Sequence, residues 1–168
     1  MNRRPILPLL TIIIALGLAG CASNQNLRST DGTTWQPATE APTASDSAKA
    51  DRLWQVFERY EGTPYRYGGT SASGFDCSGF ITTAFDEALG RRLPRTTSQM
   101  LAAGDVVGRD QLRAGDLVFF RIKGKDQHAG IYMGDDSFIH SSTSIGVTRS
   151  SLNGYYWRGR FSQARRFD

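Results

Sequence analysis

Residues 74–80 read Gly-Phe-Asp-Cys-Ser-Gly-Phe and place a cysteine between a glycine-containing loop and an apolar segment. From Cys77 to Leu89, apolar side chains return at three- and four-residue steps, and Gly90 follows where a helix would close. This pattern predicts a helix over residues 77–89, with Asp76 as a candidate N-cap. Cys77 then lies in the first helical turn, where unpaired N–H groups and the helix dipole favour a thiolate and can meet an oxyanion.

The regions on either side of this stretch are also helical or irregular. Residues 46–60 repeat large apolar side chains at helical spacing, with Ser47 or Asp46 as candidate caps, and predict an amphipathic helix. Residues 63–74 are dense in Gly, Pro, Ser and Thr and predict a loop. Residues 96–99 fit a capping box and predict a further, short helix.

The second half of the chain changes to the pattern of strands. Its apolar runs are separated by Gly, Asp and Ser, and they cover residues 116–121, 128–133, 137–142 and 146–150. Such runs predict an antiparallel meander. Helices followed by strands indicate an α+β domain in which a helix packs on one sheet face. We find no internal repeat and no second domain.

The chain contains two histidines, His128 and His140, and both fall on predicted strands. Taken singly, each would be an ordinary packed and hydrogen-bonded residue. Cys77 has no cysteine partner within the predicted domain and, as a nucleophile, needs a proton carrier. Together the three residues predict catalysis in which Cys77 attacks, His128 moves the proton and His140 orients His128. A zinc site is the alternative, but three ligands without a closely spaced pair fit it poorly, so we expect no metal and no cofactor.

The hairpin between the histidine strands decides whether the two imidazoles meet. Because side chains alternate faces along a strand, a two-residue Asp135-Asp136 turn would separate His128 from His140. A three-residue loop over residues 134–136 instead sets the two histidines diagonally on one face, about 7–8 Å apart at the backbone. His140 then faces Gly130. We expect this longer loop, or a bulge with the same effect.

The first segment, MNRRPILPLLTIIIALGLAGC, carries arginines ahead of an apolar run and small residues before Cys21. The run is shorter than the roughly 20 residues of a spanning helix and is interrupted, which indicates a secretory signal over residues 1–20. Leu18-Ala19-Gly20-Cys21 resembles the lipobox at which bacterial lipoprotein precursors are acylated and cut. We therefore expect a lipid on Cys21, and Ala22 in place of Asp favours the periplasmic face of the outer membrane. A hydrophobic anchor that stays uncleaved is the alternative.

The stretch after the lipobox is rich in Ala, Ser, Thr and Pro and cannot bury enough apolar surface to fold. It predicts a tether over residues 21–47, in which the role of Trp35 is open, and one domain over residues 48–168. Removal of Arg3 and Arg4 lowers the net charge from +4 to +2, which is too mild for nucleic-acid binding. The arginines near the C-terminus indicate a solvated basic face, with contact to an anionic polymer such as peptidoglycan as the alternative. They are Arg158, Arg160, Arg165 and Arg166.

Ordered blocks of this sequence resemble the NlpC/p-sixty peptidases, papain-like enzymes of bacterial cell walls, from about residue 50 to the C-terminus. The blocks are Pro64-Tyr65-Arg66-Tyr67-Gly68-Gly69, Asp76-Cys77-Ser78-Gly79-Phe80, Leu93-Pro94-Arg95, Gly115-Asp116-Leu117-Val118-Phe119-Phe120, His128-Ala129-Gly130-Ile131-Tyr132 and Phe138-Ile139-His140. The resemblance implies a papain-like α+β fold, with N-terminal helices packed on an antiparallel sheet and the nucleophile at a helix N-terminus.

The same resemblance assigns site residues. It implies Cys77 as nucleophile, His128 as base and His140 as the third polar residue, in agreement with the argument from the residues themselves. It also implies that Tyr65 lies near the oxyanion or the substrate carbonyl. Asp76 and Ser78 would line the substrate groove.

Within the family, residues 146–167 are most similar to the murein endopeptidase lipoproteins related to MepS. This similarity implies hydrolysis of the D-alanyl to diaminopimelate cross-link of peptidoglycan. Cleavage between γ-D-glutamyl and diaminopimelate in stem peptides is one alternative, and a non-catalytic wall-binding lipoprotein is another. The implied partners are stem peptides, cross-links and a membrane reached through the lipid anchor. A regulatory periplasmic protease or adaptor is a further candidate partner, which the sequence does not identify.

Overall fold

The computed structural model describes residues 43–124 and 127–168. The expected signal peptide, the lipidation site Cys21 and Trp35 lie outside these residues. The helices are α1 (Ala44–Tyr60), α2 (Cys77–Leu89), α3 (Thr97–Ala103) and the short 3₁₀ turn η1 (Arg109–Gln111). In the described part of the chain, no helix is long and apolar enough to cross a membrane.

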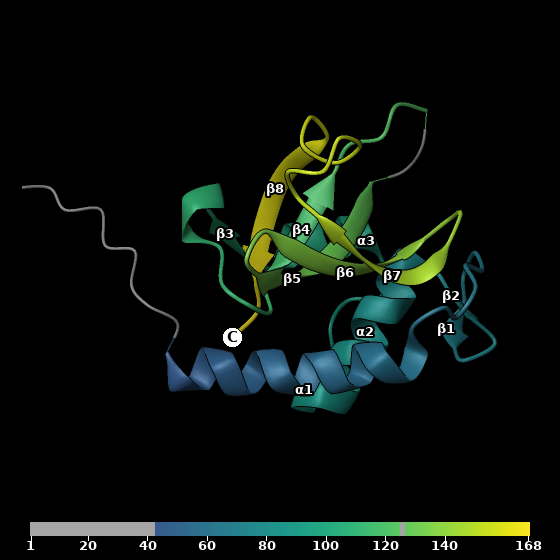
Figure 1. The fold of residues 1–168 in the computed structure, drawn as a ribbon, viewed down its shortest axis with the longest axis horizontal. Coiled ribbons are helices and arrows are strands. Elements are labelled where there is room, and N and C mark those ends of the chain that lie inside the picture. Colours follow the sequence, from purple (N-terminus) through teal and green to yellow (C-terminus); the bar gives the residue numbers. More distant parts are fainter. Residues whose placement is uncertain (1–42, 125–126) are drawn as a thin grey trace, which may run out of the picture. The chain divides into compact units, whose positions relative to one another are not determined.

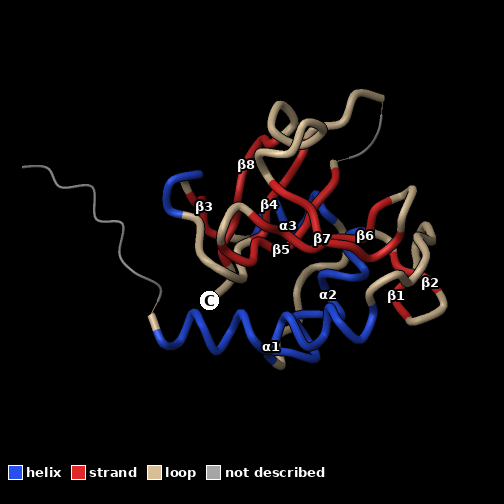
Figure 2. Tube along the Cα trace, viewed as in Figure 1, coloured by secondary structure: helices blue, strands red, loops and turns tan. Residues whose placement is uncertain are grey.

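A six-stranded antiparallel sheet forms the second layer, with the strand order β3-β8-β4-β5-β6-β7 (Figures 1 and 2). Its strands are β3 (Asp105–Val107), β4 (Leu117–Phe120), β5 (His128–Gly134), β6 (Ser137–Ser142), β7 (Gly146–Ser151) and β8 (Phe161–Arg166). A small ribbon of β1 (Thr70–Ser71) and β2 (Gly74–Phe75) precedes α2. Helix α2 contacts β5 and β6, and α1 packs on α2. The expected α+β architecture, with a helix on one sheet face, is confirmed.

Helix α2 has the boundaries that its sequence predicts. The Asp76 side chain accepts a hydrogen bond from the N–H of Gly79, and Gly90 closes the helix in the left-handed conformation at φ 63°. The face of α2 toward the sheet buries Phe80, Ile81 and other apolar side chains in a core shared with β4 and β5. Burial of this face is what holds the helix on the sheet.

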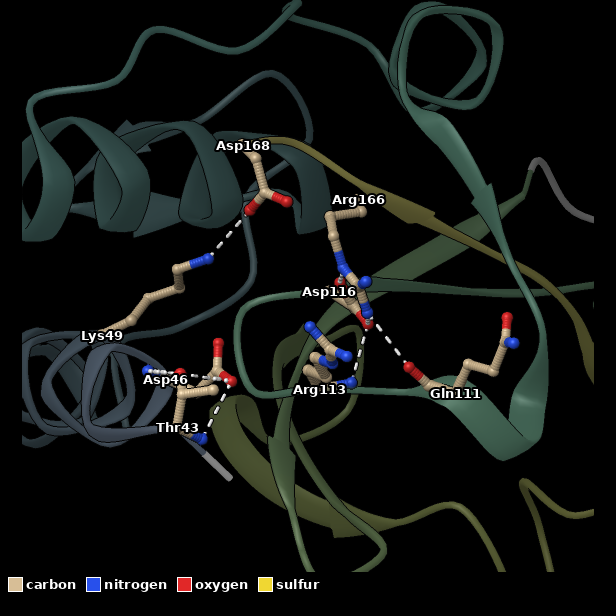
Figure 3. Close-up of polar contacts among 8 residues, drawn as sticks. All are labelled: Thr43, Asp46, Lys49, Gln111, Arg113, Asp116, Arg166 and Asp168. Atoms are coloured by element: carbon tan, nitrogen blue, oxygen red, sulfur yellow. Dashed lines mark hydrogen bonds and ion pairs between the residues drawn. The ribbon is translucent and has the colours of Figure 1, made fainter. Parts of the chain in front are cut away.

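Helix α1 begins earlier than expected. Its N-cap is Thr43, whose hydroxyl accepts from the N–H of Asp46, while the Asp46 carboxylate accepts from Thr43 (Figure 3). Neither Ser47 nor Asp46 is therefore the cap. Residues 44 and 45, which we expected in the tether alone, are helical because this reciprocal capping box lies at their N-terminal end. The capping box predicted for α3 at residues 96–99 is confirmed.

The meander over β4 to β7 is confirmed, but strands β3 and β8 were not predicted. Strand β8 lies between β3 and β4, so the C-terminal segment belongs to the sheet and not to its edge. Its sequence, FSQARR, contains one fully buried apolar side chain, Ala164. This sequence does not alternate apolar and polar residues. The segment forms a strand because it pairs with β3 on one side and β4 on the other.

Two of the C-terminal arginines are structural, which corrects the expectation of a solvated basic face. Arg166 binds the buried Asp116 through two hydrogen bonds, from Nε at 2.8 Å and from Nη2 at 2.7 Å (Figure 3). Arg165 is half-buried and donates from Nε to the carbonyl of Leu101 at 2.7 Å. The Asp116 carboxylate also accepts from the N–H of Arg113, so it joins the turn before β4 to β8.

The hairpin between β5 and β6 reaches the expected register by a different route. Its turn has two residues, Asp135-Asp136, both with positive φ, and Gly134 pairs with Ser137. The three-residue loop is therefore wrong. A shift of register between Tyr132 and Gly134 supplies the extra residue instead, which is the bulge that we named as an equivalent.

The Asp116–Arg166 pair should support the C-terminal strand. Asp116→Asn keeps the size of the side chain but leaves the partly buried guanidinium without its counter-charge. We expect the free energy of unfolding to fall by about 3 kcal/mol, the order found for breaking a buried ion pair, in urea denaturation of the full chain.

Lys49→Gln is the matched control, because its ion-pair partner Asp168 is 65% exposed. Surface pairs of this kind contribute about 0–1 kcal/mol. Equal losses of stability in the two variants would contradict a structural role for the Asp116–Arg166 pair.

Candidate active site

A groove of about 1550 Å³ contains every side chain that the sequence singled out for catalysis or substrate contact. These side chains are Tyr65, Asp76, Cys77, Ser78, His128 and His140. One wall comes from the loop after α1, the start of α2 and residues 95–98, and the other comes from the sheet and residues 156–157. The groove therefore lies at the junction of the helical layer and the sheet.

The two histidines contact each other directly. Nε2 of His128 lies 2.8 Å from Nδ1 of His140, and both side chains are buried. Nε2 of His140 in turn lies 3.0 Å from the hydroxyl oxygen of Ser150 on β7. The sheet thus holds a hydrogen-bonded chain of three side chains, in the order His128, His140, Ser150. The expectation that both imidazoles share one sheet face is confirmed.

Trp157 covers this chain on the groove side. Its ring stacks on His128 with a centroid distance of 5.3 Å and meets the His140 ring edge-on at 5.0 Å. Burial lowers the pKa of His140 well below its ordinary value, and the proximity of His128 lowers it further. His140 is therefore neutral at physiological pH.

The thiol of Cys77 does not have the lowered pKa that its place at a helix N-terminus suggested. Burial raises its pKa above the ordinary cysteine value, and the Asp76 carboxylate adds to the rise. Backbone hydrogen bonds from Ala129, Ser78 and Cys77 itself oppose these effects but do not outweigh them. The expectation was wrong in sign because desolvation of a thiolate costs more than the helix terminus returns.

Asp76 holds the surroundings of Cys77 together. Its Oδ1 accepts from the N–H of Gly79 at 2.6 Å and from the hydroxyl of Ser78 at 3.1 Å. Its Oδ2 accepts from the N–H of Gly68 at 3.0 Å. Arg95 binds both oxygens, at 3.1 Å from Nη1 and 2.8 Å from Nη2. Asp76 therefore joins the start of α2 to two loops that line the groove.

The close approach of one of these loops explains two of the glycines in the quoted blocks. A Cβ on Gly79 would lie 2.0 Å from the carbonyl oxygen of Gly69, and Gly68 has a φ of 73°. Both observations assign these glycines to the shape of the loop.

Three residues of the site were not assigned a role from the sequence: Arg95, Ser150 and Trp157. Arg95 belongs to the quoted block Leu93-Pro94-Arg95. Its partner Asp76 lies 19 residues earlier, so no local sequence pattern predicts the bidentate pair. Ser150 lies at the end of a predicted strand, ten residues after His140 in the sequence. Its contact with His140 follows from the register in which β6 and β7 pair, and the sequence does not reveal that register. Trp157 belongs to an irregular segment without periodicity.

The described residues, 43–124 and 127–168, contain no group of three or more His, Cys, Asp and Glu side chains that could hold a metal ion. The contact between His128 and His140 is also a direct nitrogen-to-nitrogen hydrogen bond. One ring nitrogen of each histidine is thus used by the other. The arrangement suits proton transfer better than metal ligation.

Residues 62–166 match the model of the NlpC/P60 family. The chain is 37% identical over 168 residues to the murein DD-endopeptidase MepS/murein LD-carboxypeptidase of Escherichia coli K12, a match that covers 92% of this chain and 88% of that protein. It is 43% identical over 129 residues to the gamma-DL-glutamyl hydrolase of Bacillus subtilis, which covers 74% of this chain and 31% of the hydrolase.

The fold is similar to that of solved members of the same family. The crystal structure of an NlpC/P60 family protein from Bacillus cereus aligns with a TM-score of 0.64 and 35% sequence identity. The alignment covers 70% of this chain and 40% of that one.

The Asp76–Arg95 pair should make stability depend on pH. Burial alone would raise the pKa of the Asp76 carboxyl, but the bonds from Arg95, Gly79 and Ser78 and the charge of Arg95 outweigh it, so the pKa is lowered. A lowered pKa adds stability that is present above the ordinary pKa of about 3.9 and is lost as the pH falls through the folded value.

Arg95→Gln should therefore lower the free energy of unfolding at pH 7 by about 1 kcal/mol, a small value because Arg95 is partly exposed. The difference from the native chain should shrink below about pH 4, where Asp76 becomes protonated. Urea denaturation at several pH values measures both effects. Arg92→Gln, an exposed neighbour without an ion pair to any described residue, is the control. A loss of stability that does not vary with pH would contradict the assignment.

Proposed function

The chain belongs to the NlpC/P60 family of cysteine peptidases, and we propose that it hydrolyses peptide cross-links in peptidoglycan. The observation that carries this proposal is the His128–His140 hydrogen bond in the same groove as Cys77. The similarity to a murein endopeptidase over nearly the whole chain supports the substrate class. No cofactor is required for the reaction.

Cys77 is the nucleophile in this proposal. Its Sγ attacks the scissile carbonyl while the thiol proton passes to Nδ1 of His128, because Nε2 of His128 already bonds His140. The C–N bond then breaks, and His128 gives the proton to the leaving amine. Water attacks the resulting thioester, passing a proton to His128, and the thiol regains a proton when the S–C bond breaks. The N–H of Cys77 and the hydroxyl of Tyr65 are the candidates for stabilising the oxyanion.

The hydrogen-bonded chain fixes the tautomers that this reaction needs. If Nδ1 of His128 accepts the thiol proton, Nε2 carries hydrogen and donates to Nδ1 of His140. His140 then carries its own hydrogen on Nε2 and donates it to Ser150. Because His140 is neutral, it orients His128 rather than stabilising its charge. Ser150 is a positioning residue in this scheme, since it sets the tautomer of His140.

The D-alanyl to diaminopimelate cross-link is the bond that we propose is cut. The alternative bond, between γ-D-glutamyl and diaminopimelate, is favoured by the similarity to a gamma-DL-glutamyl hydrolase. A non-catalytic wall-binding role is the third possibility, and the presence of Cys77, His128 and His140 in one groove argues against it. Asp76 and Ser78 would shape the groove for whichever stem peptide it binds.

We further propose that the protein is lipid-anchored at the periplasmic face of the outer membrane. The proposal rests on Leu18-Ala19-Gly20-Cys21, with the lipid on Cys21, and on Ala22 at the following position. The tether that follows would let the domain reach the peptidoglycan. A periplasmic protease or adaptor that controls the level of the protein fits this location.

Defined muropeptides test the reaction. We expect the full chain to release monomers from cross-linked dimers, detected by mass, and Cys77→Ala to release none, because the thioester cannot form. Cys21→Ala, which removes the lipidation site alone, is the matched control and should still cleave soluble dimers. Monomers whose stems are cut would assign the γ-glutamyl bond instead. Binding without any product from the native chain would support the non-catalytic reading.

Ser150→Ala tests the orienting chain. We expect kcat on the same dimers to fall about five-fold with KM unchanged, since one buried hydrogen bond contributes about 1 kcal/mol. Ser150→Thr keeps the hydroxyl and should restore kcat. Ser144→Ala removes a hydroxyl from the same groove without touching a histidine and serves as the control. An equal change of KM and no rescue by threonine would reduce Ser150 to a structural role.

A further inference from the structure

A second cavity, of about 710 Å³, opens beside the catalytic groove. Ile122 and Tyr156 line both spaces, so the two lie next to each other. The cavity lies between residues 121–123, which follow β4, and residues 155–160, which lead into β8. The N–H of Arg121 donates to the carbonyl of Arg160 at 2.8 Å and joins these two segments.

The described side chains that line this cavity carry charge of one sign. Its cationic side chains are Arg121, Lys123, Arg158 and Arg160, and none of the described residues that line it is a carboxylate. Within residues 43–124 and 127–168, no carboxylate forms an ion pair with any of these four cations. Arg121, Lys123 and Arg158 are exposed to solvent. A concave surface with this charge attracts anions more strongly than isolated cations on a flat face do.

One of these cations is held in a fixed orientation. The guanidinium of Arg160 lies 4.0 Å from the centroid of the Tyr156 ring and donates to the carbonyl of Tyr156. Arg158 lies over the ring of Tyr155 at 5.9 Å. Stacking on aromatic rings limits the freedom of an arginine side chain, so less entropy is lost when it binds a ligand.

The catalytic groove itself is electrically unlike this cavity. Its cation on the helical side, Arg95, is neutralised by Asp76. Serine and threonine line much of the rest, including Thr97, Thr143 and Thr148. An extended ligand that lies along both spaces therefore meets neutral polar groups around Cys77 and, at one end, cations that form no ion pair with a described carboxylate.

We propose that this cationic cavity is a substrate subsite which binds free carboxylates of the peptidoglycan stem peptide beside the scissile bond. The inference rests on the proposed function and deepens it. Stem peptides carry free carboxylates, and arginine binds a carboxylate through paired N–H donors. The C-terminal arginines thus divide into two sets: Arg165 and Arg166 stabilise the sheet, and Arg158 and Arg160 recognise substrate.

An anionic lipid surface is the other ligand that basic side chains could bind. A membrane is attracted to an open basic face. These cations instead line a hollow that shares Ile122 and Tyr156 with the catalytic groove. Its position next to the groove favours the peptide over the membrane.

The test compares cross-linked dimers whose stem carboxylates are free with the same dimers after amidation, using the full chain. We expect the native chain to have a KM about five-fold lower for the free acids, the size of one or two exposed charge contacts. Lys123→Gln/Arg158→Gln should raise KM for the free acids by about the same factor, leave kcat unchanged and abolish the difference between the two substrates. Arg52→Gln/Arg92→Gln removes as much charge outside both cavities and should keep the native preference.

Three outcomes overturn the proposal while leaving the proposed function intact. The native chain could cleave both dimers with equal KM, or the two double variants could behave alike. Alternatively, the Lys123/Arg158 variant could lose binding to phosphatidylglycerol vesicles while keeping its preference for free acids, which would assign the cavity to lipid. If the native chain cleaves neither dimer, the proposed function fails. In that case, calorimetry still measures how the Cys77→Ala variant binds stem peptides with free and with amidated carboxylates. Equal affinities for the two peptides would overturn the subsite proposal.

Discussion

The carboxylate of Asp76 is the constraint on which the site depends. It caps helix α2, which begins with Cys77, and it binds the loop before that helix and Arg95 after it. A helix N-terminus leaves N–H groups without intrahelical partners, and a buried acceptor there fixes where the first turn starts. The position of Cys77 relative to the groove walls therefore follows from one anion. Its charge is retained inside the protein because Arg95 compensates the cost of burial.

The sheet imposes a second constraint that is independent of the first. The two histidines meet because a bulge after Tyr132 compensates for a two-residue turn, so that the residues of β5 and β6 pair in the register that puts both rings on one face. The Asp116–Arg166 pair secures β8 against β4, the neighbour of β5. Cys77 and His128, the proposed nucleophile and base, thus come from two layers, and the packing of α2 on β5 and β6 brings them into one groove.

The sequence predicted the parts of this arrangement that have local signals. The apolar spacing and flanking cap residues of α2 fixed both of its ends, and alternating apolar runs located β4 to β7. Strand β8 could not be found this way, because its arginines look solvated until Asp116 is placed beside them. The conformation of the β5–β6 hairpin could not be predicted either. A two-residue turn of aspartates with positive φ, combined with a bulge, gives the same strand register as the three-residue loop that we expected. Arg95 and Ser150 take their roles from partners that are distant in the chain, so residue type alone could not assign them.

Burial of the thiol changes how the catalytic residues divide the work. A helix N-terminus alone would favour a standing thiolate, but burial raises the pKa of the Cys77 thiol and works against one. The geometry of His128 then matters more than a pre-formed charge. A neutral His140 suits this requirement, because a carboxylate at that buried position beneath Trp157 would itself have to be desolvated. The hydroxyl of Ser150 completes the orientation at lower cost, since it needs no counter-charge. In this site, the hydrogen bonds of His140 and Ser150 orient His128. In a triad with aspartate, the charge of the carboxylate would contribute as well.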